Sequence, residues 1–145
     1  MKHHIIISLS LSLLLFAGCG GNVGLSGKVV FSDDKSPVPT GTVGLISESG
    51  TFSTRGTIKP DGTFVVGSTK ANDGLPPGKY QGSVSAMKLI GTQPSNDPEA
   101  AGEPIYEWLI DPRYGNPTTS GITIDITSTT KNFVIEVDRY QAKKK

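Results

Sequence analysis

The sequence predicts an all-β sandwich that follows a cleaved secretion signal. Three observations lead to this prediction. Apolar and polar residues alternate in about seven short runs, as they do along half-buried strands. The 145 residues include 18 glycines and 10 prolines, which separate these runs in the way that turns do. After the signal, no stretch shows a convincing helical period.

The first 18 residues have the organisation of a bacterial signal peptide. Residues 1–4 carry the positive charge, and residues 5–16 form an apolar run interrupted only by three serines. This run fits the ~7–15 residues of a signal core and is shorter than the ~20 residues that cross a bilayer. Phe16-Ala17-Gly18-Cys19 follows, with the only cysteine of the chain. Removal of residues 1–18 leaves a length that is usual for one domain.

Cys19 and the residues before it resemble the lipobox of bacterial lipoproteins, although Phe16 stands where leucine is usual. In that family the signal is cut before the cysteine, whose thiol receives diacylglycerol with acyl chains such as palmitate. The alternative is an ordinary signal peptide followed by an incidental cysteine. The resemblance implies that Cys19 is the lipidation site and that the membrane is one partner of this protein.

The chain after Cys19 divides into three parts. Residues 19–23 are the expected lipidated N-terminus and short tether, residues 24–140 the sandwich, and residues 141–145 a basic tail. The short tether would hold the domain close to the membrane. Gly20, where aspartate would retain a lipoprotein in the inner membrane, favours the outer membrane. We therefore expect a cell-envelope protein on the periplasmic or surface face of the outer membrane.

Charge and histidine usage exclude several classes of function. The chain has 14 basic and 13 acidic residues, and one lysine lies in the signal, so 13 of each remain. A balanced domain lacks the clustered positive charge that nucleic-acid binding needs. His3 and His4 both lie in the signal, so the mature domain has no histidine for a catalytic base, a Ser-His-Asp triad or an ordinary zinc site. We expect no catalytic residues, no cofactor and no metal.

Alternation and turn residues locate the predicted strands. Asp61-Gly62 between two β-rich runs predicts a hairpin turn, because glycine accepts the positive φ of a tight turn. Residues 88–121 are expected to form a long irregular connection, with residues 91–103 disordered. The seven predicted strands are Gly27–Phe31, Gly41–Ile46, Ser53–Ile58, Thr63–Val66, Gly78–Met87, Ile122–Ile126 and Asn132–Val137.

Four motifs in order carry a further resemblance. They are Gly27-Lys28-Val29-Val30-Phe31 with the following Pro37 to Val43, Asp61-Gly62-Thr63-Phe64, Gly74-Leu75-Pro76-Pro77-Gly78-Lys79-Tyr80, and Ile110 to Thr123. Together they resemble the carboxypeptidase regulatory-like, or transthyretin-like, domain of planctomycete-type lipoproteins over about residues 24–138. Leu109-Ile110-Asp111 and the insertion at 91–103 depart from that pattern.

This resemblance implies a seven-stranded, prealbumin-like sandwich with Tyr114 packed against its edge. It also implies that Thr118, Thr119 and Ser120 hydrogen-bond the backbone leading into the strand at Ile122. Transthyretin-type sandwiches include a hydrolase that depends on histidines and on a particular C-terminal tail. The part of this sequence after residue 18 lacks both features. We therefore predict a domain that is not an enzyme.

Two functions from different classes stay open. The first is a non-catalytic structural or protein-interaction module held at the envelope. The second is a carbohydrate-binding module with an aromatic site at Tyr106, Trp108 and Tyr114 and with Arg113 nearby, because sugar C–H faces stack on aromatic rings. The simpler interpretation of Tyr106 and Trp108 is that they alternate on one face and cover the end of the core. The expected partner is thus an envelope protein or a glycan.

Overall fold

A computed structural model describes residues 25–67, 74–94, 101–127, 129–130 and 132–142. The predictions for the signal 1–18, for Cys19 and for the tether 19–23 lie outside the described residues, as do the last three lysines of the basic tail. In the part of the chain that is described, no helix is long and apolar enough to cross a membrane.

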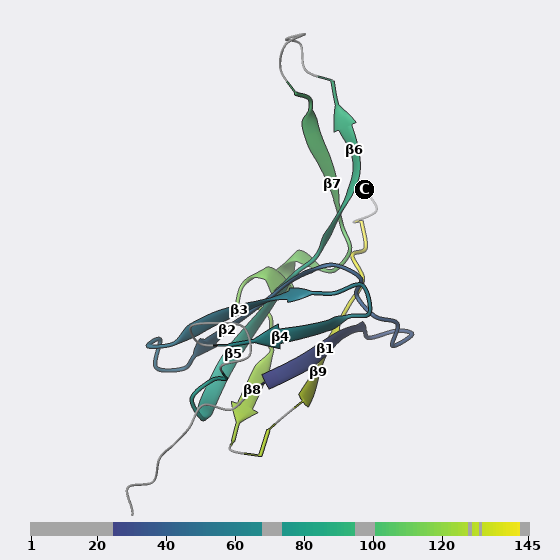
Figure 1. Cartoon of the computed structure of the whole chain (residues 1–145). Coiled ribbons are helices and arrows are strands. Elements are labelled where there is room, and N and C mark those ends of the chain that lie inside the picture. The colour runs from purple at the N-terminus through teal and green to yellow at the C-terminus, as the bar shows by residue number, and fades with distance from the viewer. Residues whose placement is uncertain (1–24, 68–73, 95–100, 128, 131, 143–145) are drawn as a thin grey trace, which may run out of the picture.

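Two sheets form a β-sandwich, and a two-stranded hairpin stands off one end of it (Figure 1). The three-stranded sheet has the order β4-β1-β9, and the four-stranded sheet the order β3-β2-β5-β8. The sandwich strands are β1 (Leu25–Phe31), β2 (Gly41–Ser47), β3 (Ser53–Ile58), β4 (Thr63–Val66), β5 (Gly78–Ser85), β8 (Thr123–Ile126) and β9 (Asn132–Val137). These seven strands coincide closely with the seven predicted ones.

The core lies between the two sheets, and along most strands buried residues alternate with outward-facing ones; the end of β1, where Val29, Val30 and Phe31 are all buried, departs from this pattern. On β2, Val43 and Leu45 are fully buried, whereas Gly44 between them lies on the outer face. On β5, Tyr80 and Val84 point inward, and the Tyr80 hydroxyl donates to the Pro76 carbonyl 2.8 Å away. Strands with one buried face produce this alternation because successive side chains point to opposite sides. The period-two prediction of the core is therefore confirmed.

The direction of the strands gives the sandwich two distinct ends. Leu25 begins β1 at one end, which we call the entry end. β1 and β9 run in parallel from there to the other end, where the Ser32 amide donates to the Val137 carbonyl. β5 also ends there, since Ser85 pairs with Thr42 at the start of β2. The entry end and the end from which the hairpin grows are therefore opposite.

The β-sandwich is as predicted, but the predicted number of seven strands was wrong, because the residues that the structure describes form nine. The two additional strands are β6 (Met87–Gln93) and β7 (Glu103–Trp108), and all their residues except Met87 lie in the segment 88–121 expected to be irregular. That expectation also fails at its end, where η1 (Pro112–Gly115) is a 3₁₀ helix. Of the part expected to be disordered, residues 91–93 and 103 belong to strands, and residues 95–100 lie outside the described residues. Gly91 and Pro104 are disfavoured in strands, and the sequence therefore gives only a weak strand signal here.

Candidate functional site

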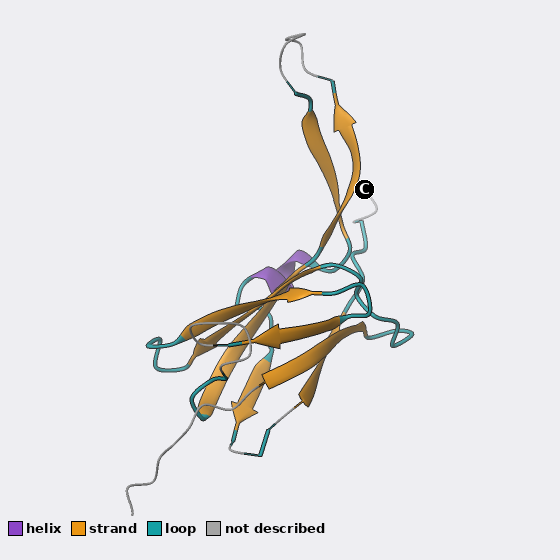
Figure 2. Ribbon diagram, viewed as in Figure 1, coloured by secondary structure: helices purple, strands orange, loops and turns teal. Residues whose placement is uncertain are grey.

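The β6–β7 hairpin is an arm that projects beyond the sandwich (Figures 1 and 2). A single residue, Ala86, separates β5 from β6, so the hairpin continues the line of β5 past the core. Its base is firmly held: the Leu109 amide donates to the Ala86 carbonyl, and Ala86 and Ile110 are fully buried. Beyond the base, every residue of β7 and every residue of β6 except Gly91 is exposed.

One face of the hairpin carries no charge. Cross-strand partners lie on the same face of a ribbon, and the register pairs Met87 with Trp108 and Leu89 with Tyr106. The register shifts between Leu89 and Gly91, and beyond this shift the pair of Thr92 and Pro104 lies on the same face. We call it the apolar face, and its residues are Met87, Leu89, Thr92, Pro104, Tyr106 and Trp108.

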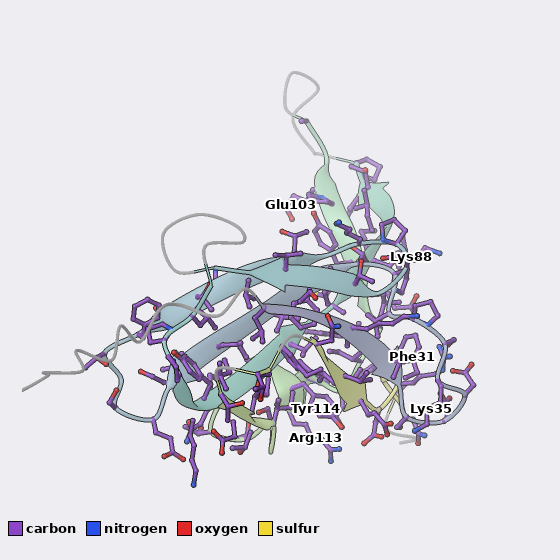
Figure 3. The ribbon with its side chains drawn as sticks, turned by 60° about the horizontal axis from the view of Figure 1, so that its bottom comes forward. Phe31, Lys35, Lys88, Glu103, Arg113 and Tyr114 are labelled. Atoms are coloured by element: carbon purple, nitrogen blue, oxygen red, sulfur yellow. The ribbon has the colours of Figure 1, made fainter. Side chains whose placement is uncertain are left out.

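The opposite face holds all the charged side chains of the two strands. Lys88 lies opposite Glu107, and Glu103 lies opposite Gln93 near the tip. Figure 3 labels Lys88 near the base of the arm, beside the end of the sandwich, and Glu103 further along it. We call this the charged face, and its residues are Lys88, Gly91, Gln93, Glu103, Ile105 and Glu107.

The apolar face is open to solvent. Leu89 and Tyr106 are each 55% exposed, Met87 is 40% exposed and Trp108 37%. Six of the nine large hydrophobic residues that are exposed in the described part of the chain belong to this hairpin. Isolated exposed apolar residues are ordinary, but a contiguous exposed group marks an interaction site. The hairpin is therefore the candidate functional site.

The two edges of the hairpin are poorly suited to accept another strand. On β6, Ile90 has no partner in the register and forms a bulge between Leu89 and Gly91. On β7, Pro104 has no backbone N–H. Bulges and prolines at edges oppose pairing with further strands. A partner would therefore bind the apolar face of this hairpin and not its edges.

The four residues predicted as a ligand site fall into two separate groups. Tyr106 and Trp108 lie on the apolar face of the hairpin, where their side chains are 55% and 37% exposed. Arg113 and Tyr114 belong to η1, which lies against β5 in the body of the sandwich (Figure 3). Tyr114 is buried, as its expected packing against the sandwich edge requires. The expected site for a sugar is therefore not assembled as one cluster.

Tyr114 and Arg113 fasten the C-terminal strand. The Tyr114 hydroxyl accepts a hydrogen bond from Arg113 Nη2 at 2.7 Å and donates to Asp138 Oδ2 at 3.1 Å. Arg113 also forms an ion pair with Asp138, and the Ser32 hydroxyl donates to the same carboxylate. The bonds from Ser32 and Tyr114, followed by the Arg113 charge, lower the pKa of Asp138. These contacts give Arg113 and Tyr114 a structural role.

A second polar cluster closes the same end of the sandwich. The Arg139 guanidinium lies 3.6 Å from the centre of the Phe31 ring and pairs with Asp33 at 2.9 Å and Asp34 at 2.8 Å. The Ser36 side chain and backbone donate to Asp34, and these bonds, together with Arg139, lower the pKa of Asp34 to about 2. The cluster holds the β1–β2 connection at the base of the hairpin.

Acidic residues line a hollow of about 310 Å³ beside these clusters, among them Asp33, Asp111 and Asp138. Each already has a partner: Asp33 pairs with Arg139, Asp138 with Arg113, and Asp111 caps η1 by accepting from the Arg113 amide. Within the described ranges, no group of three or more acidic, cysteine or histidine side chains is arranged to hold a metal ion. The aspartates that line the hollow therefore stabilise the fold through contacts with neighbouring residues.

Sequence reasoning missed the role of Met87 and Leu89, which complete the apolar face. The alternation from 103 to 108 places Pro104, Tyr106 and Trp108 on one side, and it is visible in the sequence. Their partners across the ribbon are harder to identify, because the extra residue Ile90 reverses the phase of β6.

No family model matches the chain, and no curated protein matches it. Among solved structures, it is similar to the major pilin subunit BcpA of Bacillus cereus, with 16% identity, a TM-score of 0.46, and coverage of 83% of this chain and 31% of the pilin. A variant of the same pilin gives 17% identity, a TM-score of 0.46, and coverage of 82% and 30%. The chain is also similar to a 9R-lipoxygenase from Cyanothece, with 15% identity, a TM-score of 0.40, and coverage of 96% of this chain and 19% of the lipoxygenase. This chain spans less than a third of the length of each of these three proteins.

Proposed function

We propose that this protein is a non-catalytic envelope module, anchored to the membrane through lipid on Cys19, that binds protein through the apolar face of its β6–β7 hairpin. The observation that carries the proposal is the exposure of Met87, Leu89, Tyr106 and Trp108 on one uncharged face of a projecting arm. A partner protein that covers this face would remove its apolar surface from water.

The energetics of a lone hairpin support this role. A two-stranded ribbon has no second layer and is marginally stable by itself in water. Here the sandwich holds its base through Leu109 and Ile110, and the rest of the arm contributes nothing to the core. An exposed apolar ribbon that the fold does not need favours aggregation unless it binds something. Its presence is therefore best explained by binding.

The direction of the chain supports an arm that reaches away from the membrane. Six residues of chain lead from Cys19 to Leu25, so the lipid would lie within about 20 Å of Leu25 at ~3.3–3.6 Å per extended residue. β1 alone spans about 23 Å at ~3.3 Å per residue, and the hairpin begins at its far end and projects beyond it. An anchor at the entry end would therefore leave the hairpin tip out of reach of the same bilayer.

We also propose that the sandwich is a carboxypeptidase regulatory-like domain. Seven strands in two sheets and the buried Tyr114 are in accord with what that resemblance implies, and Ser120 Oγ donates to the Gly82 carbonyl on β5 at 2.6 Å. Ser120 Oγ also accepts from the Ile122 amide, at the entry to β8. The hairpin is then an addition inserted between the fifth and sixth strands of the sandwich.

Photo-crosslinking in the native envelope tests the proposed function. A photoreactive amino acid replaces Leu89 on the apolar face, and in the control chain it replaces Lys88 on the charged face. We expect a polypeptide adduct from position 89 that is absent from position 88. The double substitution Tyr106→Ser and Trp108→Ser should abolish this adduct, whereas Glu103→Ser with Glu107→Ser should preserve it. Absence of a polypeptide adduct from position 89, or equal adducts from both positions, would refute a protein-binding face.

A glycan is the second candidate ligand, because Tyr106 and Trp108 share one exposed, uncharged face of β7. Side chains two residues apart on a strand lie about 6.6 Å apart, so both rings would present surface to the same chain of sugars. Such a site would not include Arg113 or Tyr114. Trp108 is the only tryptophan, so its fluorescence tests this candidate. A saturable change on titration with envelope polysaccharide favours the glycan, and an unchanged spectrum removes it.

A further inference from the structure

We infer that the partner of the apolar face is a second copy of this chain, packed face to face with both hairpins pointing in the same direction. This inference rests on the proposed function and names the partner. The charged faces of the two arms would then point outward on both sides of a small four-stranded, two-layer assembly.

The distribution of charge makes the apolar face compatible with itself. A symmetric interface places each residue near the same patch of its partner, so a charged patch would repel its own copy. All three charged side chains of the two strands, Lys88, Glu103 and Glu107, lie on the opposite face. Met87, Leu89, Tyr106 and Trp108 would therefore meet their equivalents without placing like charges together, and without burying an unpaired charge.

The geometry of anchoring selects face-to-face packing. Two copies anchored in one membrane through their entry ends present their hairpins side by side, related by a two-fold axis along the membrane normal. About such an axis, equivalent strands run parallel, so joining edges would require parallel pairing of β7 with β7 or β6 with β6. Pro104 and the bulge at Ile90 oppose pairing at both edges. Stacking of the apolar faces requires no hydrogen bonds from the edges.

The size of the face predicts where the dimer forms. A ribbon of six residue pairs is about 20 Å long and about 10 Å wide with its side chains, which is less than the ~800 Å² per partner of a standard stable interface. Free in solution, the pair should be weak. Anchoring both copies in one membrane raises their effective concentration and strengthens the same contact. We therefore expect a dimer on membranes and a monomer in dilute solution.

Disulfide formation on vesicles tests this inference. Thr92→Cys places a thiol on the apolar face near the tip while retaining both aromatic residues, and Gln93→Cys is the matched control on the charged face. Each full-length lipidated chain is reconstituted into phospholipid vesicles as the sole protein and mildly oxidised. The native Cys19, once lipidated, contributes no thiol. We expect disulfide-linked dimer from Thr92→Cys on the order of tenfold more than from Gln93→Cys.

Two further arms complete the test. Adding Tyr106→Ser and Trp108→Ser to the Thr92→Cys chain should remove the dimer, and release into dilute detergent should do the same. Little dimer from Thr92→Cys, or equal dimer from both cysteine positions, overturns self-association. If that happens while position 89 still crosslinks to a different polypeptide in the envelope, the protein-binding function stands and only the partner is wrong. If position 89 yields no polypeptide adduct, the proposed function itself fails.

Discussion

The Tyr114 hydroxyl donates a hydrogen bond to Asp138 Oδ2, 3.1 Å away, and so joins η1 to the residue that follows β9. The same oxygen accepts from Arg113 Nη2 and, at 3.3 Å, from the Asp138 amide. One phenol therefore holds together two segments at the base of the hairpin.

Tyr114→Phe should lower the free energy of unfolding by about 1–2 kcal/mol, because it removes hydrogen bonds to a carboxylate, a guanidinium and an amide. Urea denaturation followed by circular dichroism measures this change. Tyr106→Phe is the matched control on the exposed apolar face and should leave the midpoint unchanged. Equal effects of the two substitutions would show that the Tyr114 hydroxyl contributes nothing specific.

The separation of core and hairpin predicts different outcomes for one substitution at two leucines. Leu45→Ala removes a fully buried side chain and should cost about 2–5 kcal/mol of stability, through lost burial and the cavity left behind. Leu89→Ala on the hairpin should change stability by about 0.5 kcal/mol or less. The melting temperatures of the two variants, measured by thermal unfolding, compare these losses of stability. A large loss at position 89 would mean that the hairpin belongs to the folding core.

Acid should destabilise the domain partly through Asp34. The folded pKa of Asp34 is lowered to about 2 from 3.8, so its contribution to stability is fully present above pH 3.8. That contribution is lost as the pH falls from about 4 towards 2, because the unfolded state then binds the proton more tightly than the folded state. Asp34→Asn should therefore flatten this part of the curve of melting temperature against pH. The control is Asp125→Asn, at an exposed position of β8. It should leave the fall in melting temperature below pH 4 as in the wild type.

Two glycines with positive φ should differ in their tolerance of alanine. A Cβ at Gly62 (φ 81°) would lie 2.7 Å from the Val29 carbonyl oxygen and 2.8 Å from Pro37 Cβ, so the β1–β2 connection would have to shift. A Cβ at Gly50 (φ 69°) would meet nothing within 4 Å. Gly50→Ala should cost about 1 kcal/mol, the strain of the left-handed backbone alone. Gly62→Ala should cost clearly more in the same urea titration, and an equal cost would contradict the close approach.

The seven strands of the sandwich and most of their buried positions were predictable from the order of the residues alone. In a strand with one buried face, apolar residues recur at every second position, and this pattern is visible in the sequence. Examples are Val43 and Leu45 on β2 and Ile135 and Val137 on β9. The Asp61-Gly62 turn was predictable for the same reason, since its positive φ is a requirement of adjacent residues.

The polar contacts between distant residues and the exposed face of the hairpin could be identified only from the folded structure. Arg139 meets Asp33 from 106 positions away, and Tyr114 meets Asp138 from 24, and no local period encodes such pairs. The hairpin also needed the structure: its strands contain Gly91 and Pro104, and the bulge at Ile90 shifts the phase of one strand against the other. Which side chains share an exposed face depends on the register between strands, and register is set by pairing across the ribbon.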